Sequence, residues 1–175
     1  MDIKVEVKDE AVVNLLNRLK SRARDLTPAM RVIGEIVRSS VLKNFMAGGR
    51  PDRWTPTKVL STYLSYTMRK TGSGSRRKAY TLRGGLTKGF ERYAAGKKTL
   101  IDTGRLKNSI TARAYSGRAV VGTNVIYAAI HQFGGMAGRG RKVRIPARPF
   151  LMVQDEDWPA IRQSLERHLF GGSER

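Results

Sequence analysis

The sequence predicts an α+β fold in which a small, mostly antiparallel sheet packs against amphipathic helices, with a long basic loop excursion. Apolar residues recur at helical spacing in two N-terminal segments, and "SITARAYSGRAVVGT" alternates on both sides of a tight turn. Residues 48–99 follow neither period. We expect a single α+β domain over residues 1–175, with residues 48–99 as a basic, Gly/Ser-rich, partly irregular excursion and residues 134–145 as a basic loop.

The N-terminal part is expected to form a short strand and two helices. Residues 3–7, "IKVEV", alternate as a strand with one buried face does. A first helix follows from Asp9 to about Arg24, because its apolar residues share one stripe. In the second helix, Thr27 is the expected N-cap, and Pro28 stands at the first helical position. Its apolar face is formed by Met30, Ile33, Ile36, Val37, Val41, Leu42 and Phe45, and "AGG" ends it near Ala47.

The excursion over residues 48–99 combines turn residues with dense positive charge, so we expect no ordered core to run through it. Two segments within it, "VLSTYLSYTM" and "GLTKGFERYAAG", have the composition of short helices that dock loosely or become ordered only against a neighbour. Aromatic residues are interspersed among the bases, which leaves stacking on single-stranded nucleic acid open: Trp54, Tyr63, Tyr66, Tyr80, Phe90 and Tyr93.

Regular structure is expected again from residue 100. Asp102 or Thr103 caps a short helical turn, and the "SITARAY" and "AVVGT" segments pair as an antiparallel hairpin. Residues 124–135 follow as a helix on which Ile126, Ala129, Ile130 and Phe133 share one spacing. After the basic loop, "LMV" at 151–153 is predicted to be a short strand. Asp157 is predicted to cap a last helix that buries Ile161, Leu165, Leu169 and Phe170.

The charge is concentrated in the middle of the chain. The formal net charge is +20, and residues 53–153 hold 21 basic residues but only two acidic ones, for a net +19. A field of that size opposes compaction unless a polyanion or an acidic partner neutralises it. Nucleic acid, an acidic protein surface or an anionic membrane are the partners that such charge permits, with contacts to the phosphate backbone favoured over base reading.

Catalytic and cofactor sites find little support, so we expect no enzyme, no metal and no cofactor. The chain has no cysteine, and its two histidines, His131 and His168, lack a second ligand at helical spacing. Glu91 and Asp102 are the only acids of the central region, and they stand eleven residues apart in a stretch expected to be flexible. No apolar run is long enough for a membrane span, and the N-terminus lacks signal-peptide features, which indicates a protein made in the cytoplasm.

Three ordered motifs resemble those of the phage virion morphogenesis family, the Mu-like and P2-like tail-completion group. They are "LIDTGRLKNSI", "VVGTNVIYAAIHQFGG" and "RIPARPFL", and "NFMAGGRPDRWTPT" near residue 50 is similar as well. The resemblance implies a non-catalytic virion protein of the tail and neck. It would complete the tail and support head-tail joining as part of a homo-oligomeric ring, expected to be hexameric, with other tail, neck or connector proteins as partners and no membrane. Genomic DNA in the lumen is a further expected partner.

The candidate site residues fall into two groups. Those expected to face DNA or an acidic neighbour are Arg69, Lys70, Arg76, Arg77, Lys78, Arg83, Lys88, Lys97, Lys98, Arg139, Arg141, Lys142, Arg144 and Arg148. Those expected to shape the family motifs are Asp102, Thr103, Gly104, Tyr127, His131, Phe133, Gly134, Gly135, Pro146, Pro149 and Phe150. Tyr127, His131 and Phe133 are expected to be packing residues at a helix end.

The segment "IPARPF" is expected to be stiff, because proline at 146 and 149 restricts its backbone to extended forms. We interpret it as the return stem of an assembly loop whose mobile, charged tip is "GRGRKVR". A plain rigid turn into the last strand is the competing interpretation. Two other classes remain for the whole chain: a free nucleic-acid-binding protein acting through phosphate contacts, and a nuclease that would depend on Glu91 or Asp102.

Overall fold

The computed structural model describes residues 9–56, 58–72 and 74–171, and the strand predicted at residues 3–7 lies outside them. Helices α1 (Glu10–Arg24) and α2 (Thr27–Ala47) begin and end close to where their apolar periods predict. Asp9 caps α1 by accepting hydrogen bonds from the Ala11 and Val12 amides. Thr27 is the first residue of α2 rather than its cap, because the Asp25 carboxylate accepts from the Thr27 amide at 2.9 Å. These hydrogen bonds, first from the Thr27 side chain and then from its backbone, lower the pKa of Asp25.

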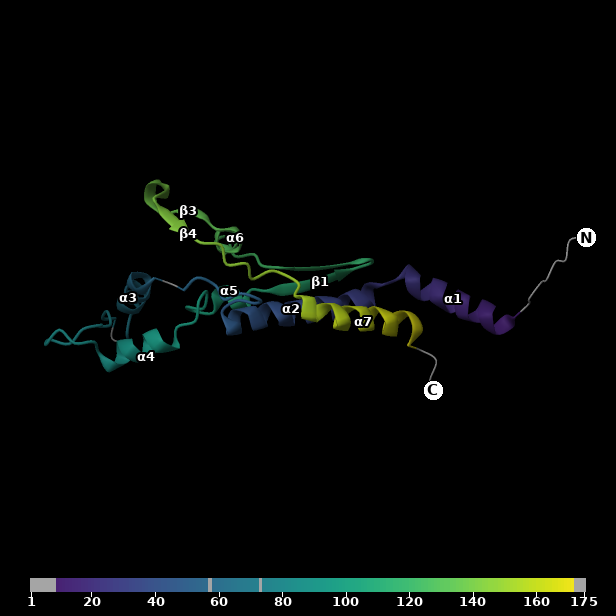
Figure 1. Cartoon of the computed structure of the whole chain (residues 1–175), viewed down its shortest axis with the longest axis horizontal. Coiled ribbons are helices and arrows are strands. Elements are labelled where there is room, and N and C mark those ends of the chain that lie inside the picture. Colours follow the sequence, from purple (N-terminus) through teal and green to yellow (C-terminus); the bar gives the residue numbers. More distant parts are fainter. Residues whose placement is uncertain (1–8, 57, 73, 172–175) are drawn as a thin grey trace, which may run out of the picture. The chain divides into compact units, whose positions relative to one another are not determined.

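The predicted α+β class is confirmed: helices are combined with two small antiparallel two-stranded sheets. The sheets are the hairpin β1 (Thr111–Tyr115) and β2 (Arg118–Gly122) and the hairpin β3 (Gly135–Ala137) and β4 (Val143–Ile145) (Figure 1). The first hairpin was predicted from its alternation. The second was not, because three-residue strands are too short to show a period.

Two compact units make up the chain. The first consists of residues 1–39, 111–121 and 155–175. In its described part, α7 (Trp158–Phe170) packs against α1, and the Arg22 guanidinium donates to the Leu169 carbonyl at 3.0 Å. Gly34 of α2 faces the hairpin so closely that a Cβ there would lie 3.3 Å from the Ala112 Cβ. Phe170, which was predicted to be buried, is exposed.

The second unit consists of residues 40–110 and 122–154 and contains the tightest core. The Phe45 ring lies 5.7 Å from the Trp54 ring and 5.2 Å from the Phe150 ring, and both phenylalanines are fully buried. The Trp54 indole N–H donates to the Pro149 carbonyl at 3.1 Å. The end of α2 is therefore joined to the segment "IPARPF", although about a hundred residues separate them in the sequence.

Asn44 organises the polar part of this core. Its fully buried side chain donates to the Phe150 carbonyl at 3.1 Å, and its oxygen accepts from Arg50 at 2.9 Å and from Gln154 at 3.3 Å. The Arg50 guanidinium also donates to the backbone and side-chain oxygens of Ser40. A buried amide is tolerated when its donors and acceptors are paired, and those of Asn44 are.

The excursion differs from its prediction. Its two predicted helices are present as α3 (Val59–Met68) and α4 (Lys88–Gly96), and they pack on each other. Tyr66, Ala79 and Phe90 are buried together, with Tyr63 and Tyr93 packed against them. The expectation that no ordered core runs through residues 48–99 is therefore wrong for this part. These aromatic residues are spread over about thirty positions of the sequence but pack together in the fold, and such a cluster leaves no local period in the sequence.

The predicted strand at residues 151–153 is also wrong. Leu151–Val153 join no sheet; instead the Gln132 side chain accepts from the Phe150 and Leu151 amides at 2.9 and 3.0 Å and donates to the Leu151 carbonyl at 3.1 Å. One amide side chain thus satisfies the backbone groups that a neighbouring strand would otherwise pair. Gln132 belongs to α6 (Ala128–Phe133), which is shorter than the predicted helix over residues 124–135.

Candidate functional site

The three motif segments of the second unit meet at one pocket of about 410 Å³. Its wall includes Asp102, Thr103 and Gly104 from the turn before α5 (Arg105–Asn108), Tyr127 and His131 from the α6 region, and Pro146 and Arg148 from "IPARPF". The remaining wall residues are Lys58, Ser65, Lys97, Lys98, Leu100, Ile101, Arg105, Leu106, Val143, Arg144 and Ile145. The pocket thus unites positions that are separated in sequence by up to ninety residues.

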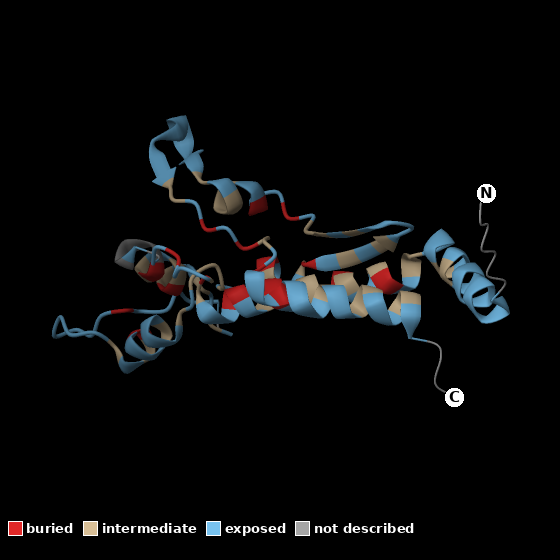
Figure 2. Cartoon of the chain, turned by 45° about the vertical axis from the view of Figure 1, so that its right-hand side comes forward, coloured by how far each residue is buried: buried red, intermediate tan, exposed pale blue. Residues whose placement is uncertain are grey.

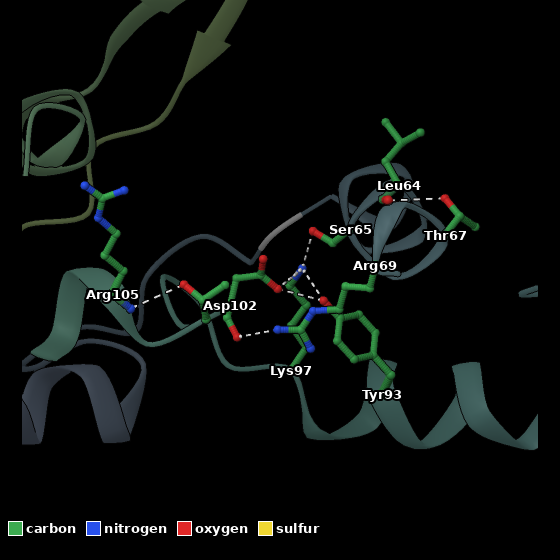
Figure 3. A network of polar contacts seen from close by, with 9 residues as sticks. Leu64, Ser65, Thr67, Arg69, Tyr93, Lys97, Asp102 and Arg105 are labelled. Carbon is green, nitrogen blue, oxygen red and sulfur yellow. Dashed lines mark hydrogen bonds and ion pairs between the residues drawn. The ribbon is translucent and has the colours of Figure 1, made fainter. Parts of the chain in front are cut away.

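Asp102 is the centre of a polar network on one side of this pocket (Figure 3). Its carboxylate accepts from the Tyr93 hydroxyl at 2.8 Å and lies 3.6 Å from the Lys97 ammonium. Lys97 also donates to the Ser65 hydroxyl at 2.9 Å, and the Arg69 guanidinium donates to the Asp102 carbonyl at 3.3 Å. The only acid of the pocket therefore fixes α3 and α4 to the turn before α5, which is a structural role.

Thr103 and Gly104 shape the start of α5. Gly104 is its N-cap with φ 81°, a left-handed conformation that favours glycine, and the Thr103 hydroxyl accepts from the Arg105 amide at 3.4 Å. The prediction that Asp102 or Thr103 caps this turn is wrong, because the N-cap is Gly104 and no side chain at that position caps the helix. Leu106 and Ile110, two apolar residues of the same motif, are buried.

His131 belongs to α6 and lines the same pocket. Its ring is 5.9 Å from the Tyr127 ring in an edge-on arrangement, and its carbonyl accepts from the Arg148 amide at 2.7 Å. Burial, and then the positive charge of Arg148, lower the pKa of His131, so the imidazole is neutral near pH 7. Within the described residues its Nδ1 atom is buried without a hydrogen-bond partner.

Arg148 does not face outward as predicted. It is 7% exposed, and its guanidinium donates to the Thr55 carbonyl at 2.9 Å and to the Pro56 carbonyl at 3.4 Å. Its burial lowers its own pKa. The two prolines hold Arg148 in the fold, where it joins "IPARPF" to the chain after Trp54. The stiffness of this segment therefore serves the second unit itself.

The "GRGRKVR" segment, predicted to be a mobile tip, forms ordered structure. A 3₁₀ turn η1 (Arg139–Arg141) connects β3 to β4, and Met136 pairs with Arg144 across the hairpin. Gly134, with φ 73°, enters the hairpin where a Cβ would lie 2.8 Å from the Ala147 amide, so the chain requires glycine there. Gly135 begins β3, directly after Gly134, the C-cap of α6.

The prediction that Phe133 and Ile126 pack on one face of the α6 region is wrong. Phe133 is 79% exposed and Ile126 is 98% exposed, whereas Ala128 is buried. The sequence predicted these side chains to face the core because of their helical spacing. In the described part of the chain they face outward instead. Phe150 does belong to the core through its contact with Phe45, whereas Pro149 is exposed and contributes its carbonyl to the Trp54 hydrogen bond.

The predicted basic residues are otherwise mostly exposed. Arg69 and Lys97 are half-buried over the Tyr93 ring, at 5.5 and 5.2 Å from its centroid, and Arg77 lies 5.8 Å from the Tyr66 centroid. The exposed members of the set are Lys70, Arg76, Arg77, Lys78, Arg83, Lys88, Lys98, Arg139, Arg141, Lys142 and Arg144. Of these, only Lys98 and Arg144 line the pocket.

Sequence reasoning missed three residues that the structure makes important. Asn44 is buried and Arg50 and Gln132 are half-buried, and each fixes a turn or a chain segment through hydrogen bonds to backbone oxygens or amides. Asn44 stood on the apolar face of a predicted helix, and this is the one signal that pointed to it. Among residues 9–56, 58–72 and 74–171, no group of three or more potential metal ligands occurs.

The comparisons with known proteins agree with the motifs. A model of the phage virion morphogenesis family matches residues 7–170. The chain is 35% identical over 168 residues to the Mu-like prophage FluMu G protein 2 of Haemophilus influenzae, and the alignment covers 95% of this chain and 96% of that protein. No solved structure matches. None of the helices in the described part of the chain is long and apolar enough to cross a membrane.

Proposed function

Because the chain belongs to the phage virion morphogenesis family, we propose that it is a structural subunit of the tail and neck that completes the tail and supports head-tail joining. In this role it assembles with copies of itself as a ring, acts without catalysis, and contacts further virion proteins. The family establishes participation in virion assembly, and the ring and its position at the head-tail joint are our inference.

The observation that supports the ring is apolar surface that stays exposed in the described part of the chain. Ile126 and Phe133 on the α6 segment are almost fully exposed. Helix α1 has no buried residue and exposes Val12, Val13, Leu15 and Leu16 over the surface that Figure 2 shows in pale blue. Apolar side chains at regular helical spacing mark surfaces that are covered by another protein. A closed ring covers two different surfaces of every subunit through one repeated contact.

Phe133→Glu tests this contact directly. A charge at an interface core is expected to weaken association about tenfold or more, while the melting temperature stays nearly unchanged because Phe133 contributes little to the subunit core. Leu82→Glu is the matched control, since Leu82 is fully exposed on the excursion. Light scattering and negative-stain microscopy of the purified chain, and of tails assembled with it, give the subunit number. A chain that stays monomeric both alone and in the virion contradicts the ring.

A free nucleic-acid-binding protein is the competing function, favoured by the exposed cations of the excursion. It predicts DNA binding whose log affinity falls steeply with log salt and which is lost on deletion of residues 69–98. Such binding by a chain that is absent from purified particles would replace the structural role.

A further inference from the structure

The pocket of the second unit carries more positive charge than the fold uses. Six cations line it, from Lys58, Lys97, Lys98, Arg105, Arg144 and Arg148, against one acid, Asp102. Lys97 is committed to Asp102, Ser65 and Tyr93, and Arg148 to two backbone carbonyls. Lys97 therefore already neutralises Asp102, the acid of the wall, and the remaining cations have no carboxylate of the described wall to pair with.

Lys98 donates to the Met46 carbonyl at 3.3 Å, which leaves Lys58, Arg105 and Arg144. The two arginines carry the inference. In the described part of the chain, neither guanidinium donates to an acceptor, and Figure 3 shows the Arg105 side chain directed away from the Asp102 network. They come from different elements, α5 and β4, yet line the same pocket. A guanidinium binds a carboxylate or a phosphate through paired N–H groups, so two of them select an anionic ligand.

The rest of the wall is apolar. Leu100, Ile101, Val143 and Pro146 contribute to it. Leu100 has φ 63°, a conformation that costs a leucine about 1 kcal/mol or more and tends to occur at functional sites. The buried and unpartnered Nδ1 of His131 adds one polar atom to the same wall. The ligand that matches this lining carries apolar groups next to its negative charge.

We propose that this pocket binds an acidic segment of another virion protein, with carboxylates on Arg105 and Arg144 and an apolar side chain against Leu100 and Val143. This inference rests on the proposed function, since it names the chemistry of a neighbour in the assembly. A separate acidic protein is the occupant we infer, because in the proposed ring the copies of this chain meet through exposed apolar surface, such as that of Phe133, and not through this pocket.

A protein segment fits better than nucleic acid. A cavity of about 410 Å³ has the size of a small-ligand site and admits a few side chains. Phosphate-backbone binding uses an extended array of surface cations, and the exposed bases outside the pocket offer that instead. The pocket and the outer basic surface are thus separate sites with different ligands.

The test uses the full chain and two double variants with the same change of charge. R105E/R144E alters the pocket, and R139E/K142E alters two exposed bases of the same unit that do not line it. The probes are a fluorescein-labelled peptide Asp-Glu-Leu-Asp-Glu-Leu, its amide counterpart Asn-Gln-Leu-Asn-Gln-Leu, and a labelled DNA duplex of about one helical turn. Binding is measured by fluorescence anisotropy, and circular dichroism confirms that both variants fold.

We expect R105E/R144E to lower the affinity for the acidic peptide about tenfold or more and R139E/K142E about twofold or less, with DNA affinity reduced similarly by both. Equal peptide loss in both variants, or peptide binding no tighter than that of the amide counterpart, overturns the proposal. A selective loss of DNA binding in R105E/R144E assigns the pocket to nucleic acid instead. Failure of the proposed function differs from all of these, because the chain would then be missing from purified particles whatever the peptide does.

Discussion

At the scale of single residues, the second unit is held by a few polar side chains that act on the backbone. Asn44, Gln132 and Arg148 each connect segments distant in sequence, and each does so through carbonyl or amide groups rather than through another side chain alone. Such contacts fix chain direction, because backbone groups point only where the chain path allows. Of the three, only Arg148 lines the pocket, and its guanidinium donates to backbone carbonyls.

Asn44→Ala is expected to lower the free energy of unfolding by about 2–4 kcal/mol, because it leaves the Phe150 carbonyl and part of the Arg50 and Gln154 donors buried without partners. Urea unfolding measures the change. Asn124→Ala, at an exposed loop position, is the matched control and is expected to change stability by about 0.5 kcal/mol or less. A loss for Asn44→Ala as small as that of the control contradicts the role assigned to Asn44.

His131 is expected to make stability depend on pH. Its pKa is lowered in the folded chain, whereas in the unfolded chain a histidine titrates near about pH 6.5. As pH falls below that value, the unfolded chain binds the proton first, so the free energy of unfolding decreases toward acid. Urea unfolding from pH 7 to 5 is expected to show a flatter profile for H131Q than for the unaltered chain. H168Q, which removes the other histidine, keeps the His131 contribution, and identical slopes for H131Q and the unaltered chain contradict it.

At the scale of elements, local periodicity was enough to predict α1, α2, α7 and the β1–β2 hairpin, since apolar residues repeat at helical or strand spacing along each of these segments. It was not enough for β3 and β4, which are three residues each, or for residues 151–153, where the Gln132 amide replaces a strand. The α3–α4 cluster was not predicted for another reason. Its rings, from Tyr63, Tyr66, Phe90 and Tyr93, come from two helices separated by an irregular loop, so they share no period in the sequence.

Phe90→Ala tests whether this aromatic cluster orders the excursion. Removing the buried ring is expected to cost about 3 kcal/mol of local stability, because Phe90 packs edge-on against both Tyr63 and Tyr66. Hydrogen exchange is expected to speed up in α3 and α4 while the amides of α2 keep their protection. Leu82→Ala, at a fully exposed position of the same excursion, is expected to change neither. Uniform acceleration over the whole chain would show that the excursion has no stability of its own.

At the scale of the whole molecule, the charge separates by unit. The second unit holds 21 of the 34 basic residues and three of the 14 acidic ones, a net +18, which leaves +2 for the first. The sequence alone located this excess, because charge is additive along a chain. It did not predict the pocket, whose wall comes from five separate stretches that only tertiary packing brings together. The motifs identified several residues of the wall but did not predict that these residues share one pocket.

The hydrogen bond between Asn44 and Phe150 closes a loop of 106 residues, and this separation has a consequence for synthesis on the ribosome. The Phe45 and Trp54 rings emerge early but find Phe150 only when the chain is nearly complete. The Tyr66–Phe90 cluster, whose members lie close in sequence, is able to assemble long before that. We therefore expect the nascent chain to fold its basic excursion first and to leave the core around Phe150 incomplete until the last fifth is made, so that apolar surface is open to chaperones in that interval.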